Sequence, residues 1–240
     1  MNELDLPALR ESLGRMGAEE VLAWAAENLR GEVVAASSLG AEGQVIYDMI
    51  NRLGLDIPAF TLDTGRLFKE TYDLIAANEQ RYGKRIKLFF PDAKEVEDMV
   101  AEHGVNLFYE SVELRRKCCR IRKLDPLAKA LKPYGAWICG LRRGQSPTRA
   151  EVSVIERDGE GRIKFNPLAG WSEQEVMDYL LRYDVPRCEL WRRGFPSVGC
   201  ACCTRAVAPG EDGRAGRWWW EDGEHKECGL HWVDGKPVRK

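Results

Sequence analysis

At 240 residues, of which 44% are hydrophobic, the chain is long enough for one large α/β domain with a small appendage. Its net charge of −2 and its pI near 6.0 give no general reason to expect nucleic acid or an anionic membrane as a partner. Because the N-terminus has no signal-peptide pattern and no run approaches the roughly 18 apolar residues of a membrane span, we predict a cytoplasmic protein.

Four short apolar runs have the character of buried parallel strands, and they lie near residues 32–37, 57–62, 86–90 and 136–139. Helical patterns lie between them, with one apolar face formed by Val45, Ile46, Met49, Ile50 and Leu53 and another by Phe68, Tyr72 and Ile75. Alternation of this kind predicts βαβ units, and therefore an α/β fold with a mostly parallel twisted sheet and helices on both faces.

Polar loops follow three of the predicted strands: "SSLGAEGQ", "DTGR" and "GLRRGQSPTR". In open α/β sheets, ligands bind beyond the carboxyl ends of the strands. The first loop leads through a glycine turn into a helix, a geometry that suits an anion, although such turns need glycine in any case. It has Glu42 where a phosphate loop would have a cation, whereas Arg142, Arg143 and Arg149 after the fourth strand favour an anionic ligand over a solvated surface.

The pattern changes after about residue 166. Ser172 and Glu175 have the spacing of a capping box in front of an amphipathic helix. Glycines, prolines, tryptophans and cysteines with little periodicity follow to the end of the chain. We therefore predict an irregular C-terminal cap that something other than hydrophobic burial holds together.

Because thiol pools in a reducing cytoplasm keep disulfides open, the eight cysteines are better interpreted as a metal site or as redox groups. Cys118 and Cys119 are adjacent, and Cys200 and Cys203 form a C-x-x-C pair. Two thiolates from each of two segments suit tetrahedral zinc or an iron–sulfur cluster, and adjacent ligands favour the wider cluster. Cations that stabilise thiolates surround the first pair: Arg115, Arg116, Lys117, Arg120, Arg122 and Lys123.

The cysteine pair, together with "GFPSVGCACCTR" and "GRAGRWWWEDGEHKECGLH", resembles the assimilatory adenylylsulfate reductases of bacteria and plants. The loops "SSLGAEGQV" and "LDTGRLFKETY" look like the modified pyrophosphate loop and the substrate-pocket loop of that family. The resemblance runs from about residue 31 to 231 and implies a fold like that of the adenine nucleotide alpha hydrolases. Related 3′-phosphoadenylylsulfate reductases share the fold and the tail but lack the four cluster cysteines.

For the cofactor, the resemblance implies one [4Fe–4S] cluster per subunit. Its ligands would be Cys118, Cys119, Cys200 and Cys203. The family usually has proline at the position of Cys202, so a fifth thiol lies beside the cluster here. The C-x-x-C spacing favours Cys200 and Cys203 as the ligands and leaves Cys202 outside the set.

For the reaction, the resemblance implies that Cys228, on a mobile tail, attacks the sulfate sulfur of adenosine 5′-phosphosulfate. AMP leaves, an S-sulfocysteine remains, and thioredoxin or a glutaredoxin-like dithiol releases sulfite. His231 would stabilise the thiolate or contact the substrate anion, and Gly229 would permit the turn. This is a step of assimilatory sulfate reduction, which leads to cysteine.

Cations should converge where the transition state gathers negative charge, and the resemblance places Lys123, Arg214 and Arg217 there, with Arg143 a weaker candidate. The nucleotide site would be lined by Ser37, Ser38, Gly40 and Leu62. We predict that Trp218, Trp219 and Trp220 pack within the cap, and that Cys139 and Cys188 are ordinary packed thiols.

These predictions divide the chain into an N-terminal helical segment (1–30), an α/β nucleotide-binding and cluster-bearing domain (31–208), and a substrate loop with the catalytic tail (209–240). Two alternatives remain open: a cluster-bearing 3′-phosphoadenylylsulfate reductase, and a zinc- or cluster-stapled redox-sensing or binding module. The second alternative gives Cys228 no role. The sequence also leaves open whether the chain forms a homo-oligomer.

Overall fold

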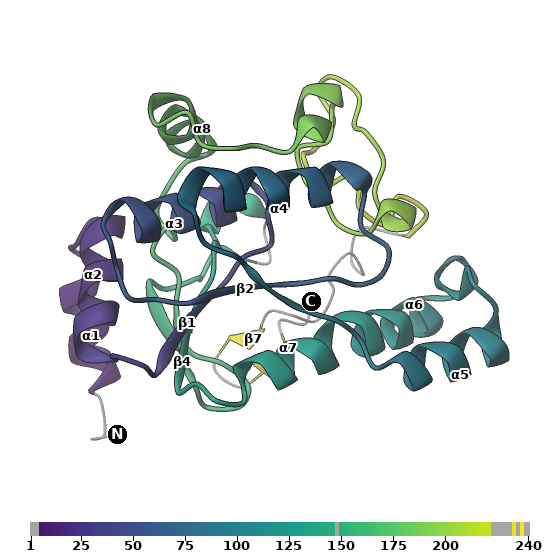
Figure 1. The fold of residues 1–240 in the computed structure, drawn as a ribbon, viewed down its shortest axis with the longest axis horizontal. Helices are drawn as coiled ribbons and strands as arrows, with labels where there is room; N and C mark the ends of the chain where they lie inside the picture. Colours follow the sequence, from purple (N-terminus) through teal and green to yellow (C-terminus); the bar gives the residue numbers. More distant parts are fainter. Residues whose placement is uncertain (1–4, 147–148, 222–231, 234–235, 238–240) are drawn as a thin grey trace.

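The structure is a computed structural model, and it describes residues 5–146, 149–221, 232–233 and 236–237. The helices are α1 (Leu6–Leu13), α2 (Ala18–Asn28), α3 (Ala41–Arg52), α4 (Lys69–Tyr82), α5 (Ala93–His103), α6 (Val112–Cys119), α7 (Asp125–Leu131) and α8 (Glu173–Arg182) (Figure 1). The strands are β1 (Val33–Ala36), β2 (Ala59–Leu62), β3 (Lys87–Phe89), β4 (Ala136–Ile138), β5 (Ile155–Arg157), β6 (Ile163–Phe165), β7 (Trp232–Val233) and β8 (Lys236–Pro237).

Six of the strands form one sheet in the order β3-β2-β1-β4-β6-β5. Strands β3, β2, β1, β4 and β6 are mutually parallel, and β5 is antiparallel to β6 at the edge. This confirms the predicted α/β fold with a mostly parallel sheet, and the four predicted strands overlap the observed ones. The β5–β6 hairpin was not predicted, although the alternation in "VIERDGEGRIKF" around an Asp-Gly pair is a hairpin signal.

Helices cover both faces of the sheet, as predicted, because alternate residues of each buried strand point to opposite sides. On one face, Val33 and Ala35 of β1 belong to a core that includes residues of α1, α2, α3 and α8. On the other face, Val34 and Trp137 pack with Leu131 of α7. Figure 1 shows α3 and α4 on one side of the sheet and α7 on the other.

The order of the strands places a reversal between β1 and β4, because the chain moves outward through β2 and β3 before it returns to β4. The chain therefore has a topological switch point between β1 and β4, and open α/β sheets bind ligands in the crevice outside the strand ends at such a point. The loops after β1 and β4 approach closely at its base, where a Cβ on Gly140 would lie 2.7 Å from Cβ of Glu42. The fold thus brings two of the three predicted ligand loops together.

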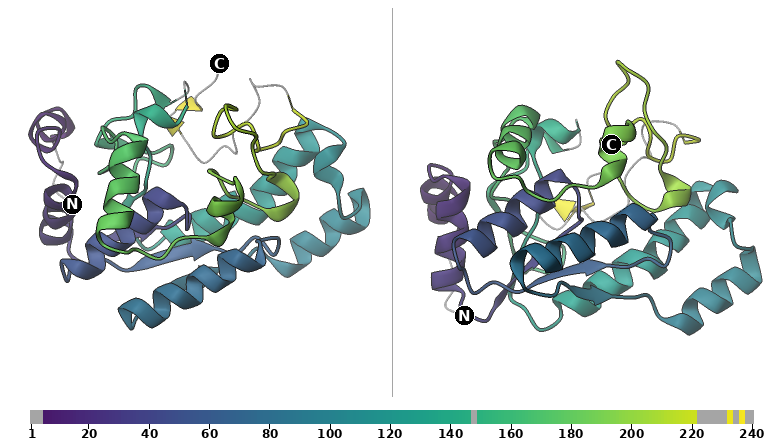
Figure 2. Two further views of the ribbon diagram at one scale, coloured as in Figure 1. Left: turned by 90° about the horizontal axis from the view of Figure 1, so that it is seen from above. Right: turned by 45° about the horizontal axis from the view of Figure 1, so that its top comes forward.

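Helix α6 continues through a π-helical turn, Arg120–Leu124, into α7. The predicted capping box of α8 is confirmed, since Ser172 Oγ accepts from the Glu175 amide at 3.1 Å. After α8 the chain has only short 3-10 turns up to residue 221, which agrees with the predicted irregular cap (Figure 2). Among the described residues, no helix is long and apolar enough to cross a membrane.

Candidate functional site: a strand-end crevice joined to a cysteine cavity

The loop after β1 is closed by the hydroxyls of two serines. Ser37 Oγ accepts from the Leu39 amide at 3.2 Å, and Ser38 Oγ accepts from the Gly40 amide at 3.3 Å. Leu39 adopts a φ of 57°, which is unusual for a residue with a side chain, and its side chain is buried. These two bonds close the turn between β1 and α3, and Gly40 is the cap residue from which α3 begins.

The three arginines after β4 bind the protein itself. Arg142 Nε donates to Glu42 Oε1 at 2.8 Å, so the carboxylate in the first turn of α3 is neutralised by a nearly buried cation. Arg143 donates to the carbonyl of Val152 at 3.0 Å, and Arg149 lies within hydrogen-bond distance of Gln145. The Glu42–Arg142 pair removes the acidic charge that the sequence places in this phosphate-type loop.

The two cysteine segments, far apart in the sequence, line one cavity. Cys118 and Cys119 end α6, Cys200 is the N-cap of a 3-10 turn, and Cys203 is the last residue of that turn; all four are 7–8% exposed. The complete lining comprises these four cysteines with Arg66, Phe108, Arg115, Arg122, Lys123, Cys202 and Trp218. The structure thus brings together the four predicted ligands, the predicted cation Lys123, and the fifth thiol.

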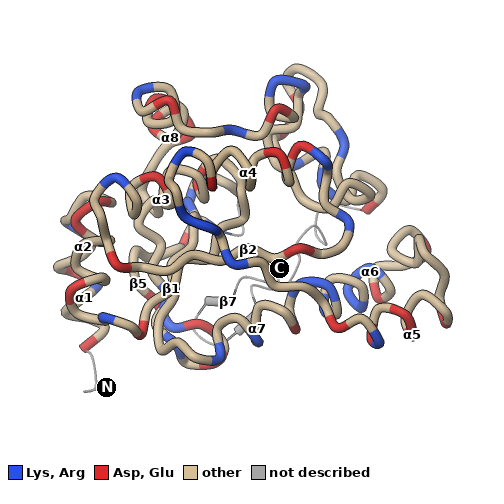
Figure 3. Tube along the Cα trace, in the orientation of Figure 1, with Lys and Arg blue, Asp and Glu red and all other residues tan. Residues whose placement is uncertain are grey.

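The local sequence explains how the first cysteine pair reaches the cavity. Ser111 caps α6 by accepting from the Leu114 amide at 3.1 Å, and the helix ends at Cys119. The π-helical turn that follows inserts an extra residue per turn, a feature frequent at functional sites. It carries Arg122 and Lys123 to the same cavity, and α6 with this turn bears a run of basic residues (Figure 3).

The loop after β2 joins the cysteine cavity to the ligand edge of the sheet, which is the edge formed by the carboxyl ends of the parallel strands. Thr64 Oγ1 lies 3.3 Å from Cys200 Sγ, and Arg122 donates to the Thr64 carbonyl at 2.7 Å. The Ala201 amide also donates to the carbonyl of Arg66 at 2.8 Å. Both cysteine segments are therefore bonded to one loop at the carboxyl end of a sheet strand, and Leu62, a predicted nucleotide contact, is the last residue of that strand.

Burial dominates the acid–base properties of these thiols. Burial, with a contribution from Cys119, raises the pKa of Cys118 to about 11. The sulfur atoms of Cys202 and Cys203 lie 3.8 Å apart, and the hydrogen bond between them lowers the pKa of Cys202 to about 6 while raising that of Cys203. The hydrogen bond to Cys202 and burial favour the neutral thiol of Cys203, burial favours that of Cys118, and a bound metal centre would favour both thiolates.

The cysteine thiols and the hydrogen-bond donors that line the cavity suit a sulfur-rich anionic group. Two donor atoms at the cavity, Arg122 Nε and Trp218 Nε1, are buried and have no hydrogen-bond partner among the described residues. In the described part of the chain, no three His, Cys, Asp or Glu side chains are grouped as they stand to hold a metal ion. Four buried cysteines are the ligand set of a [4Fe–4S] cluster, and the two donors without partners suit its sulfur atoms, so the residues fit the predicted group.

The predicted substrate arginines lie in the cap. Arg217 is buried, its guanidinium stacks 4.8 Å from the Trp218 ring, and its backbone forms a β-bridge with Thr204. Arg214 is half-buried three residues earlier. Trp218 is 1% exposed, which agrees with the prediction that it packs within the cap, whereas Trp219 is partly exposed. Cys228 and His231 lie outside the described residues.

The comparisons with known proteins agree with this geometry. The model of the phosphoadenosine phosphosulfate reductase domain family matches residues 32–206, which is most of the chain. The chain belongs to this family. The sequence resemblance to the adenylylsulfate and phosphoadenylylsulfate reductases is thereby confirmed, and the matched range contains both cysteine segments and all three strand-end loops.

Two curated relatives in the family are named adenosine 5′-phosphosulfate reductase. The chain is 51% identical to the protein of Burkholderia cepacia over 86% of its own length and 83% of the relative. It is 52% identical to the protein of Allochromatium vinosum over 83% of its own length and 78% of the relative. A crystal structure of phosphoadenylyl-sulfate reductase from Candida auris, a phosphate complex, matches with a TM-score of 0.72 and 27% identity, covering 86% of this chain and 99% of that one.

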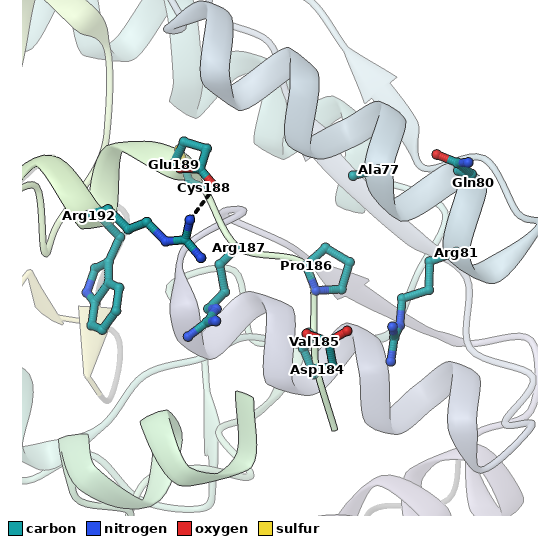
Figure 4. A pocket seen from close by; sticks show the side chains of 11 residues that line it. Ala77, Gln80, Arg81, Asp184, Val185, Pro186, Arg187, Cys188, Glu189 and Arg192 are labelled. Carbon is teal, nitrogen blue, oxygen red and sulfur yellow. Dashed lines mark ion pairs between the residues drawn. The ribbon is translucent and has the colours of Figure 1, made fainter. Parts of the chain in front are cut away.

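A second cleft, of about 500 Å³, lies between the end of α4 and residues 184–192. Figure 4 shows Arg81, Arg187 and Arg192 along it, with an ion pair of 3.6 Å between Arg192 and Glu189. None of the predicted site residues lines this cleft. Cys188, which we expected to be an ordinary packed thiol, does line it and is half-buried. The sequence offered no periodic signal here, because the cleft is formed by an irregular segment.

Proposed function

We propose that this protein reduces adenosine 5′-phosphosulfate to sulfite and AMP in assimilatory sulfate reduction, with a dithiol protein such as thioredoxin as the electron donor. One observation carries the proposal: the cysteine cavity and the ligand edge of the sheet are joined through Thr64 and Arg122. The names of the relatives at about 50% identity support the same substrate. This family assignment makes the zinc-stapled binding module the weaker alternative.

The cofactor in this proposal is one [4Fe–4S] cluster held by Cys118, Cys119, Cys200 and Cys203. When bound, it would supply a compact anionic group that fixes the two cysteine segments and balances the buried cations around them. Arg122 Nε and Trp218 Nε1 would then find acceptors, which the described residues do not give them. Cys202 is half-buried at the rim of the cavity, and its place beside Cys203 makes it the fifth thiol of the site.

In this proposal, two regions of the chain bind different parts of the substrate. The serine-closed loop of Ser37, Ser38 and Gly40, with Leu62 at the end of the next strand, would take the adenosine and its phosphate at the sheet edge. Lys123 would take the sulfonate, because it is half-buried in the cavity beside the β2 loop. The arginines of the cap, Arg214 and Arg217, and the weaker candidate Arg143 would add positive charge around the leaving phosphate.

In this proposal, Cys228 and His231 of the C-terminal tail carry out the chemical step. The thiolate of Cys228 attacks the sulfate sulfur, the bond from that sulfur to the phosphate oxygen breaks, and AMP leaves with the electron pair. His231 would stabilise the thiolate before attack. A thiolate of the dithiol donor then attacks Cys228 Sγ and releases sulfite, and its second thiol resolves the mixed disulfide, so the donor supplies both electrons.

Four measurements on the anaerobically purified protein test the proposal. With adenosine 5′-phosphosulfate and no reductant, we expect about one AMP per active site and one added SO₃, about 80 Da, on the peptide that contains Cys228. With reduced thioredoxin we expect sulfite to form. Faster turnover of the 3′-phosphorylated substrate would instead favour the function named for the Candida auris structure, and no adduct from either substrate would contradict the reductase mechanism.

A further inference from the structure

A buried ion pair connects α6, the helix that ends in Cys118 and Cys119, to Glu221, the last described residue before the tail. Arg115 donates from Nε to Glu221 Oε1 at 2.8 Å and from a terminal nitrogen to Glu221 Oε2 at 2.7 Å. The two side chains are 0% and 3% exposed. This is the two-pronged arrangement in which a guanidinium fixes both the position and the orientation of a carboxylate.

The pair lies in the wall of the cysteine cavity. Arg115 is one helical turn before Cys119, and its guanidinium stacks 4.7 Å from the ring of Trp218. The Trp218 amide donates to the carbonyl of Cys203 at 3.2 Å, and the Glu221 amide donates to the carbonyl of Trp218 at 2.9 Å. Residues 218–221 are therefore bound to both cysteine segments at once, by backbone bonds on one side and by the ion pair on the other.

The energetics of a buried ion pair suggest that this pair fixes the position of Glu221 relative to α6 more than it stabilises the fold. Two charges lose their hydration when they are buried, and an apolar pair of similar volume often stabilises a fold as well or better. What the ion pair adds is a fixed distance and direction between α6 and Glu221. Glu221 is followed after seven residues by Cys228, so the pair defines the point from which that segment departs.

We propose that Arg115 and Glu221 are positioning residues for the nucleophile: their ion pair fixes Glu221, seven residues before Cys228 in the sequence, against the cysteine cavity. The inference rests on the proposed function in one respect, the identity of the nucleophile. It goes beyond that function by assigning a positioning role to a pair of residues outside the proposed ligands and substrate contacts, one of which, Arg115, lines the cysteine cavity.

The experiment measures the single-turnover rate constant for formation of the Cys228 adduct, with enzyme in excess over adenosine 5′-phosphosulfate. Glu221→Gln keeps the size of the side chain and removes its charge, whereas Glu221→Asp keeps the charge and shortens the reach. A misplaced reacting group costs rate more than affinity, so we expect the Gln variant to lose about tenfold or more in this rate constant. AMP affinity and iron content should stay within about twofold of the wild type.

A second readout follows the tail directly. Trypsin cleaves after Lys226, and loss of the ion pair should accelerate cleavage there while leaving sites elsewhere in the chain unchanged. The matched control is Glu211→Gln, which breaks the more exposed two-pronged pair between Glu211 and Arg205 in the same cap. That variant should show wild-type adduct formation and wild-type cleavage after Lys226.

The outcomes separate the inference from the proposed function. A wild-type protein that forms no adduct on Cys228 removes the proposed function, and the inference with it. If the wild type reacts, an unchanged rate constant in Glu221→Gln overturns the inference alone. So does a parallel loss of rate, AMP affinity and iron, because that pattern indicates a structural role only. Should Glu221→Gln fail to fold, the Asp variant is judged by the same criteria.

Discussion

Gly140 lies at the base of the crevice between β1 and β4, and replacing it by alanine tests whether that close approach matters. A Cβ there would lie 2.7 Å from Cβ of Glu42, 3.1 Å from the Glu42 carbonyl carbon and 3.3 Å from the Gly43 amide. Cβ atoms essentially never approach other heavy atoms within 3.0 Å. Because two of the three obstacles are backbone atoms of α3, the helix itself has to move away from the β4 loop.

Overpacking of this kind typically costs about 1–3 kcal/mol, which for a chain of this size lowers the melting temperature by about 2–4 °C per kcal/mol. The shift also displaces the first turn of α3, so we expect weaker binding of AMP by the Gly140→Ala variant. Thermal unfolding gives the loss of stability, and calorimetric titration with AMP gives the loss of affinity.

Gly144→Ala is the matched control, because it adds the same methyl group to the same loop. Its Cβ would have Arg142 as its nearest neighbour at 3.7 Å, an ordinary contact. That variant should be as stable as the wild type or slightly more so, since alanine restricts the unfolded chain. If Gly140→Ala matches Gly144→Ala in both melting temperature and AMP affinity, the crevice does not depend on this contact and the reasoning is wrong.

Two further predictions concern the cofactor and the cap. Serine substitution of Cys118, Cys119, Cys200 or Cys203 should abolish iron binding, measured as iron per chain, whereas Cys202→Ser should retain it; iron loss on Cys202→Ser with retention on Cys203→Ser would reverse the ligand assignment. Arg214→Ala and Arg217→Ala should each remove one charge-assisted contact, about 1.5–3 kcal/mol or roughly tenfold to a hundredfold in adenosine 5′-phosphosulfate affinity; unchanged affinity in both variants would remove them from the substrate site.

The sheet and its helices could be predicted because burial imposes a period on the sequence. Strand β1 is apolar on both faces, since Val33 and Val34 contact different cores. Four apolar residues of the predicted helix face are buried in α3: Val45, Ile46, Met49 and Ile50. The edge hairpin was missed because Glu156 and Lys164 sit at positions where a buried strand is expected to be apolar. In the structure they form a buried ion pair of 2.8 Å, and only the fold shows that the two charges meet.

The site was predictable in its residues and not in its connections. Cysteine spacing and basic composition indicated the cavity, and strand-end glycines indicated the crevice. No pattern in the sequence shows that Arg142 neutralises Glu42, or that Thr64 contacts Cys200, because each contact joins segments about 100 or more residues apart. The Arg115–Glu221 pair was missed for the same reason: Arg115 appeared as one more cation in a basic run.

These connections explain how an irregular cap can hold a defined site. Residues 186–221 have little periodic apolar character, so hydrophobic packing alone gives this segment few fixed points. Its fixed points are polar instead: the Ala201 amide on the Arg66 carbonyl, the Thr204–Arg217 bridge, and the Arg115–Glu221 pair. Each has one end beside a cysteine of the cavity or the loop that contacts it. A group bound by the four cysteines would therefore stabilise the cap and align the base of the tail with the crevice in a single binding event.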